Sequence, residues 1–252
     1  MHLASVRSLL AHAREHLDAL NAAEQRYTEG DGHAAIHEVH DDGRRHLFRL
    51  KIAPPPSELA FIVGDLLHDV RSALDRIIYT MAVVGANGDP PRDQRRWYRF
   101  PITDIRAEFD EAVERMVAVP EQVVAELQRL QSFDGPMIDS VLPLYVLRDL
   151  VDSTHRESPI IGAWCAFSRF INAPGAKIAS FIPLAGAVSD GTECEVTFVD
   201  PEVDVQLEFR VHPVLQTRNA ADFWSADLPS VALGRTLTFI EGTIVPRFEG
   251  IT

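Results

Sequence analysis

Three side chains that could bind a ligand or move a proton recur at helical spacing in residues 64–76: His68, Arg71 and Asp75. Residues three, four and seven positions apart share one side of an α-helix, so this spacing places all three on one face. Arg71 falls at the edge of an apolar stripe, where a partly buried guanidinium requires an anion. Asp75 can supply that charge from one turn further on. The group therefore predicts either a structural ion pair or part of a ligand-binding site.

A second group of the same residue types follows near residue 150, where Arg148, Asp152 and His155 again share one helical face. Histidine can transfer protons near neutral pH, and arginine can hold a phosphate with two parallel hydrogen bonds. Such a pair could act on a phosphodiester without a metal. The alternative is a surface helix end, where the helix dipole favours cations and alone explains His155.

A metal site between the two predicted helices is a further alternative. The mixed nitrogen and oxygen ligands available on them are Asp65, His68, Asp69, Asp149, Asp152 and His155. Neither of these helices carries a compact Glu-x-x-His or His-x-x-x-His pair, and no metal and no cofactor are expected for the chain. Four more histidines, His33, His37, His40 and His46, fall on a predicted hairpin and are interpreted as solvated strand residues.

Other catalytic templates are absent from the sequence. There is no Gly-x-Gly-x-x-Gly or Walker loop for nucleotides and no Gly-x-Ser-x-Gly elbow. Cys165 and Cys194 show no metal-ligand spacing and lie in no recognised nucleophile context. Two buried free thiols are favoured over one disulfide bond.

The elements that position these groups are predicted to be mainly helical, with an apolar stripe along residues 57–84 typical of a bundle core. Helices are expected at 3–28, 57–84, 104–118, 120–131, 138–156 and 230–248. A hairpin is expected over 33–52 around an Asp-Gly turn, an extended segment over 98–102, and strands at 178–184, 193–199 and 203–212, the last two as a second hairpin. This pattern predicts an α+β, mainly α fold: a helical bundle with an N-terminal β-hairpin and a β-rich C-terminal lobe.

A chain of 252 residues can form one large domain. We expect a single domain over 1–252, with the bundle at about 1–157, the hairpin inserted at 33–52 and the lobe at about 158–252.

The formal charge of −13 opposes broad binding of nucleic acid or of an anionic membrane surface, although a local basic pocket could still bind one short substrate. The basic clusters at 44–45 and 92–99 are interpreted as loop or strand-edge charges. With neither a signal-peptide core nor a run of about 18 apolar residues, a cytoplasmic location is expected.

The run Gly-Asp-Leu-Leu-His-Asp-Val-Arg-Ser-Ala-Leu-Asp at 64–75 resembles a helix of an uncharacterised bacterial family that reads GD-x-x-H-N-x-R-S-A-L-D. A later segment of that family, L-x-x-L-D-x-x-D-K-H-R, is similar to residues 147–156, with Thr154 where the family has lysine. The similarity spans about residues 57–157 and implies fold more than function. A more distant resemblance is to HEPN-type helical bundles, whose metal-independent ribonucleases carry arginine, four to six residues, then histidine. Arg148 and His155 fit that spacing.

Two hypotheses of function follow. In the first, the chain is a binding module for an unidentified small ligand or protein partner, with His68, Arg71 and Asp75 at a polar cleft between helices. In the second, it is a HEPN-like ribonuclease, in which His155 moves a proton, Arg148 stabilises the phosphate and Asp152 shares their face. RNA as a substrate and a homodimer that pairs two sites are expected under the second hypothesis. The first is favoured slightly, because the net charge opposes RNA.

Overall fold

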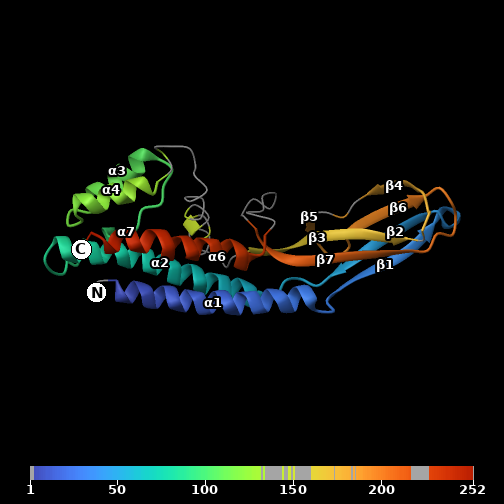
Figure 1. Cartoon of the computed structure of the whole chain (residues 1–252), viewed down its shortest axis with the longest axis horizontal. Coiled ribbons are helices and arrows are strands. Elements are labelled where there is room, and N and C mark those ends of the chain that lie inside the picture. The colour runs from blue at the N-terminus through green and yellow to red at the C-terminus, as the bar shows by residue number, and fades with distance from the viewer. Residues whose placement is uncertain are drawn as a thin grey trace. The chain divides into compact units, whose positions relative to one another are not determined.

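The computed structural model describes residues 3–131, 133, 144, 147–148, 150, 160–172, 174–182, 184, 186–216 and 227–251. The chain divides into two compact units, each built from separate stretches of sequence. Unit 1 comprises 1–19, 61–159 and 230–252, and unit 2 comprises 20–60 and 160–229. The fold is α+β (Figure 1). Among the described residues, no helix has the length and apolar character needed to cross a bilayer.

Two long helices, α1 (Ala4–Glu29) and α2 (Ser57–Gly85), begin and end close to the predicted positions. Three consecutive prolines at 54–56 precede α2 and cannot belong to a helix interior, so the helix starts at Ser57. The apolar stripe predicted for α2 is buried, with each of its members at most 1% exposed: Leu59, Val63, Leu66, Val70, Leu74, Ile77 and Met81. Burial of this stripe supplies most of the stability of such a helix.

Unit 1 also contains α3 (Arg106–Glu114), α4 (Glu121–Arg129) and the C-terminal helices. The predicted helix at 230–248 is present as α6 (Pro229–Phe239), a π-helical turn η3 (Ile240–Ile244) and α7 (Val245–Glu249). Pro246 has no N–H to donate to the preceding turn, which favours an irregular turn at this point. Most of the helix predicted at 138–156 lies outside the described residues.

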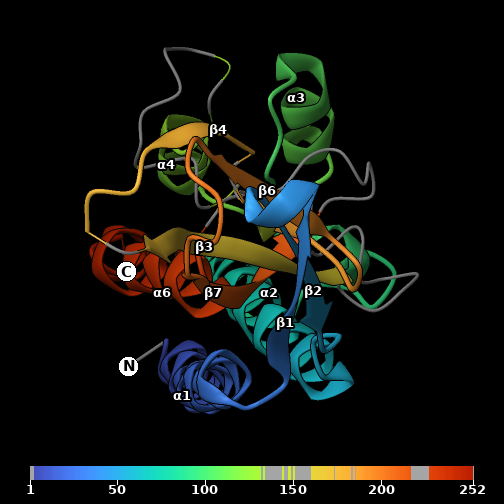
Figure 2. The ribbon, with the colours of Figure 1, turned by 90° about the vertical axis from the view of Figure 1, so that its right-hand side faces the viewer.

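Unit 2 contains two antiparallel sheets that share one apolar core (Figures 1 and 2). The first has the order β1-β2-β6-β4, and the second has the order β5-β3-β7. Their bounds are β1 His33–His40, β2 Arg45–Ile52, β3 Ile160–Asn172, β4 Ile178–Ile182, β5 Gly186–Val188, β6 Glu193–Phe198 and β7 Val205–Gln216. Phe48 and Val196 from the first sheet are buried together with Cys165 and Val211 from the second.

The predicted β1–β2 hairpin is confirmed, with the 3-10 turn η1 (Asp41–Gly43) between its strands. Along its other edge, β2 pairs with β6, so the hairpin forms part of the four-stranded sheet of unit 2. The predicted hairpin between residues 193–199 and 203–212 is wrong. Strand β6 lies between β2 and β4, so both of its edges are taken, and β7 pairs with β3 instead. The unit boundaries differ accordingly from those predicted, while the joining of both units into one domain stays a prediction.

The four hairpin histidines were all interpreted as solvated, but they differ in how exposed they are. His46 is 2% exposed and packs edge-on against Phe198. Its Nδ1 lies 2.9 Å from Nε2 of His37, and the two rings stack. The interpretation is therefore wrong for His46, because its side chain points into the core of unit 2. Burial, together with the neighbouring His46, lowers the pKa of His37.

Both cysteines of unit 2 are buried free thiols, as predicted. Burial raises the pKa of both thiols, that of Cys194 to about 11. A thiol reacts with disulfide reagents as its thiolate, so two protonated and covered thiols should resist modification. We expect neither to react with a chromogenic disulfide reagent at pH 8 in the native protein, and both to react after denaturation. Rapid labelling of the native protein would contradict this burial.

Candidate functional site

Residues 98–103 form an extended segment, as predicted for 98–102, and the segment has no strand partner among the described residues. Side chains satisfy its backbone instead. The N–H of Phe100 donates to Asp75 Oδ1 at 2.9 Å, and the N–H of Thr103 donates to Gln131 Oε1 at 3.0 Å. Gln131 Nε2 in turn donates to the carbonyl of Pro101 at 3.1 Å. These bonds fix an irregular stretch of chain, because buried backbone groups are costly to leave unpaired.

Thr103 connects this segment to the start of α3. Its Oγ1 accepts a hydrogen bond from the N–H of Ile105 at 3.1 Å and donates to Glu108 Oε2 at 2.6 Å. Thr103 lies two residues before Ile105, the N-cap of α3, and Glu108 lies in the first turn of that helix. The local sequence therefore fixes the position of α3 relative to the extended segment.

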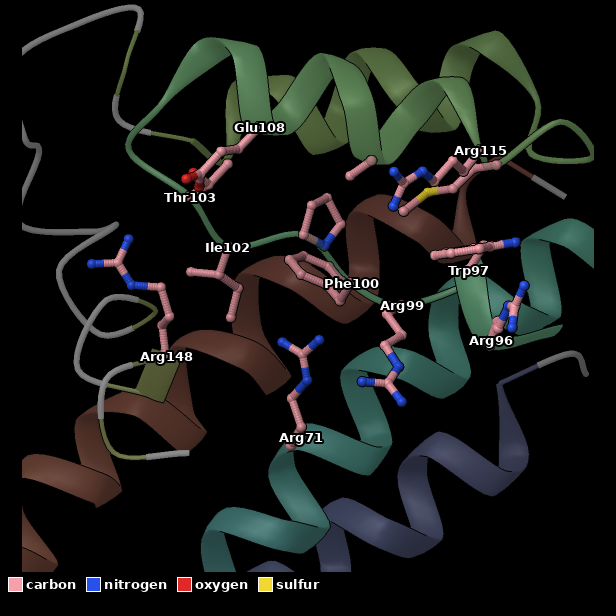
Figure 3. A pocket seen from close by; sticks show the side chains of 13 residues that line it. Arg71, Arg96, Trp97, Arg99, Phe100, Ile102, Thr103, Glu108, Arg115 and Arg148 are labelled. Carbon is pink, nitrogen blue, oxygen red and sulfur yellow. The ribbon is translucent and has the colours of Figure 1, made fainter. Parts of the chain in front are cut away.

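A pocket of about 640 Å³ lies where α2, the extended segment and α3 meet (Figure 3). This volume is typical of small-molecule sites. Its lining combines apolar groups with five arginines, and the described lining residues are Arg71, Arg96, Trp97, Arg99, Phe100, Pro101, Ile102, Thr103, Glu108, Ala112, Arg115, Met116 and Arg148. The pocket is thus a concentration of positive charge in a chain of net charge −13.

The predicted ion pair between Arg71 and Asp75 is present, with 3.0 Å between Nη2 and Oδ1. The side chains are 22% and 29% exposed, so the pair is partly buried as expected. Burial raises the pKa of Asp75, while Arg71, the Phe100 N–H and Arg99 act in the opposite direction. Because its pKa is raised, Asp75 loses its charge at a higher pH than an exposed carboxylate does.

Replacing Arg71 with alanine is expected to lower the free energy of unfolding by roughly 1–3 kcal/mol, because Asp75 loses its partly buried partner. Chemical denaturation of the variant and the wild-type protein would measure the difference. A change within about 0.5 kcal/mol would show that the pair does not stabilise the fold.

The arginines at the other end of the pocket surround one aromatic ring. The Cζ atoms of Arg96 and Arg115 each lie 4.6 Å from the ring centre of Trp97, which belongs to the 3-10 turn η2 (Arg95–Trp97). Arg115 also pairs with Glu111. Cation–π contacts hold both guanidinium groups in place and occupy the ring of Trp97. The indole therefore positions the two arginines.

Among the residues that the structure describes, the Arg99 side chain makes no hydrogen bond and no ion pair, and unlike Arg96 it does not lie over the Trp97 ring either. It lies close enough to Asp75 to act on its pKa, which places it beside Arg71 (Figure 3). Among the described lining residues, Glu108 supplies the one carboxylate. That carboxylate already accepts a hydrogen bond from the Thr103 hydroxyl. The middle of the pocket is therefore positive and able to accept an external anion.

The structure brings only part of each predicted group to this pocket. Arg71 and Arg148 line it, and Asp75 supports it from α2. His68 is exposed on α2 and is not among the lining residues. Arg148 lies at the opposite end from Trp97 and pairs with Asp104 at 3.0 Å (Figure 3). Asp149, Asp152 and His155 lie outside the described residues, so the second predicted group is described only by Arg148.

Three lining arginines were not predicted as site residues: Arg96, Arg99 and Arg115. A signal for two of them is the density of arginine at 92–99 in an acidic chain, which was interpreted as loop charge. No comparable signal exists for Arg115, because it reaches the pocket only through the packing of α3 against Trp97.

Comparison of the chain with protein-family models, with curated proteins and with solved structures gave no match.

Proposed function

We propose that the protein is a binding module for a small organic anion, and that the arginine-lined pocket of unit 1 is its binding site. The observation that carries this proposal is Arg99, whose guanidinium has no ion-pair partner among the described residues and lies beside the Arg71–Asp75 pair. An uncompensated guanidinium next to a second one favours a ligand with two acidic oxygens, such as a carboxylate or a phosphate.

The apolar lining narrows the class of ligand. Phe100 and Met116 are at most 3% exposed overall and form part of the pocket wall, together with Ile102 and Pro101. A pocket that combines an apolar wall with several arginines suits an organic molecule with a hydrocarbon body and more than one acidic group. Because Arg96 and Arg115 already occupy the Trp97 ring, we do not assign Trp97 to stacking on a ligand.

The charge of the whole chain agrees with a small ligand. A net charge of −13 repels long polyanions at a distance, whereas a compact anion can reach a local positive pocket. We place this binding module in the cytoplasm, and we treat the helices of unit 1 as a bundle that holds the pocket.

Binding of an inorganic triphosphate, used as a probe, would test the proposal by isothermal titration calorimetry. The wild-type protein is expected to bind it, and Arg99→Glu is expected to weaken binding by at least about tenfold, since a hydrogen bond to a charged group contributes roughly 1.5–3 kcal/mol. Arg92→Glu is the matched control, because Arg92 is exposed in the same arginine-rich segment and does not line the pocket. It is expected to change binding by less than about twofold.

An equal loss of affinity in both variants would show that binding depends on overall charge. The anion site would be refuted if the folded wild-type protein bound none of triphosphate, citrate and a dicarboxylic fatty acid. The two substitutions change the net charge equally, so only their position differs.

A HEPN-like ribonuclease is the second candidate, favoured by the position of Arg148 in a pocket with four other arginines that could hold a phosphate. Cleavage of labelled RNA with EDTA present would test it. If this candidate is right, the wild type cleaves and a folded His155→Ala variant does not, and the active species is a homodimer. Absence of cleavage by the wild type would leave the binding module.

A further inference from the structure

Three side chains with metal-binding atoms converge between α1 and α2, apart from the arginine pocket. His12 and His16 lie one turn apart on α1, and Asp69 lies on α2. Asp69 Oδ2 is 2.8 Å from Nδ1 of His12 and 3.6 Å from Nε2 of His16. One ligand atom from each of the three lies within 4.8 Å of the other two. All three residues belong to unit 1, and none of them lines the pocket.

The carboxylate of Asp69 points to a cation at this position. Asp69 is 8% exposed, and its Oδ2 is buried without a hydrogen-bond donor among the described residues. The His12 nitrogen is close enough to donate, but it does not meet the geometry of a hydrogen bond to that oxygen. A buried carboxylate oxygen also requires a partner.

The residue types and spacing fit a transition metal better than calcium or magnesium. Two imidazoles and one carboxylate form a ligand set found around Zn²⁺, while Ca²⁺ and Mg²⁺ prefer oxygen ligands throughout. Ligand atoms about 2.1 Å from a tetrahedral Zn²⁺ lie about 3.4 Å from one another, so small side-chain rotations would complete the site. His12 is 58% exposed, which leaves the remaining coordination position open to solvent.

We propose that His12, His16 and Asp69 bind one divalent transition-metal ion of the Zn²⁺ class and so join α1 to α2. This proposal departs from the expectation of no metal, which was based on the ligands of the helices at 57–84 and 138–156. The His-x-x-x-His pair lies in the first helix, and its third ligand comes from the buried side of α2.

Titration of the metal-stripped full-length protein with Co²⁺ tests the proposal, because cobalt in a tetrahedral site of nitrogen and oxygen ligands gives visible absorption bands. The wild type is expected to bind one equivalent, which Zn²⁺ displaces, and Zn²⁺ is expected to raise the melting temperature. His12→Ala is the main variant, since this exposed side chain can be removed without opening the core. It should weaken binding by at least about tenfold, as should His16→Ala and Asp69→Asn.

Two matched controls separate this site from adventitious histidine binding. His68→Ala removes an exposed imidazole next to Asp69, and His37→Ala breaks the His37–His46 pair of unit 2. Both are expected to bind Co²⁺ like the wild type. The proposal is overturned if the wild type binds no Co²⁺, if His12→Ala binds as tightly as the wild type, or if either control loses binding to the same extent.

Discussion

Replacing Phe100 with alanine is expected to lower the free energy of unfolding by about 3–5 kcal/mol, the range found for buried aromatic residues. Phe100 is fully buried, and its ring packs edge-on against that of Phe248 in α7, with 6.2 Å between the centres. The substitution removes apolar contacts and leaves a cavity between the extended segment and the C-terminal helix. Urea denaturation followed by circular dichroism would measure the loss.

Phe61→Ala provides the control for this prediction. Phe61 carries the same side chain on α2, but it is 63% exposed, so its removal should change stability by less than about 0.5 kcal/mol. If both variants lost the same stability, the packing of Phe100 against Phe248 would not be what holds the extended segment.

Replacing Gln131 with methionine is expected to lower the free energy of unfolding by about 2–6 kcal/mol, although the two side chains have similar volumes. The amide of Gln131 satisfies three backbone groups: the N–H of Thr103 and the carbonyls of Pro101 and Leu127. Methionine would leave the first two buried and unpaired, and each such group costs about 1–3 kcal/mol. The same denaturation experiment would measure the effect.

Gln122→Met is the matched control, because Gln122 lies exposed on α4. It is expected to change stability by less than about 0.5 kcal/mol. The Gln131 variant should also weaken triphosphate binding, since Thr103 and the residues before it line the pocket. Full stability in Gln131→Met would mean that water or a neighbouring group replaces the amide.

The local features of the fold could be predicted from the sequence because short-range signals determine them. The stripe from Leu59 to Met81 defines α2, and the Asp-Gly turn defines the β1–β2 hairpin. The sequence does not predict strand β3, because its first half, Ile-Ile-Gly-Ala-Trp-Cys-Ala, shows no clean alternation of apolar and polar residues. The residues at 200–202 resemble a hairpin turn, but the N–H of Glu202 donates to Gly43, and the chain crosses there from one sheet to the other.

The candidate site could be predicted only where its geometry is local. Arg71 and Asp75 are four residues apart on one helix, so their pairing follows from spacing. The bond from Phe100 to Asp75 and the stacking of Arg115 on Trp97 depend on segments that meet only in the folded chain. His12 and His16 have a recognisable spacing, but the buried Asp69 that would complete their site required the packing of α1 on α2.

The division of the chain into interleaved units also has a consequence for the order of events during translation. Residues 230–252 belong to unit 1, yet they leave the ribosome after all of unit 2 has been synthesised. Until then, the apolar surface at Phe100, against which Phe248 packs in the folded protein, stays exposed on the nascent chain. Exposed apolar surface of this kind invites aggregation and binding by chaperones. A stalled nascent chain ending near residue 229 should therefore be captured by chaperones more strongly than the completed chain.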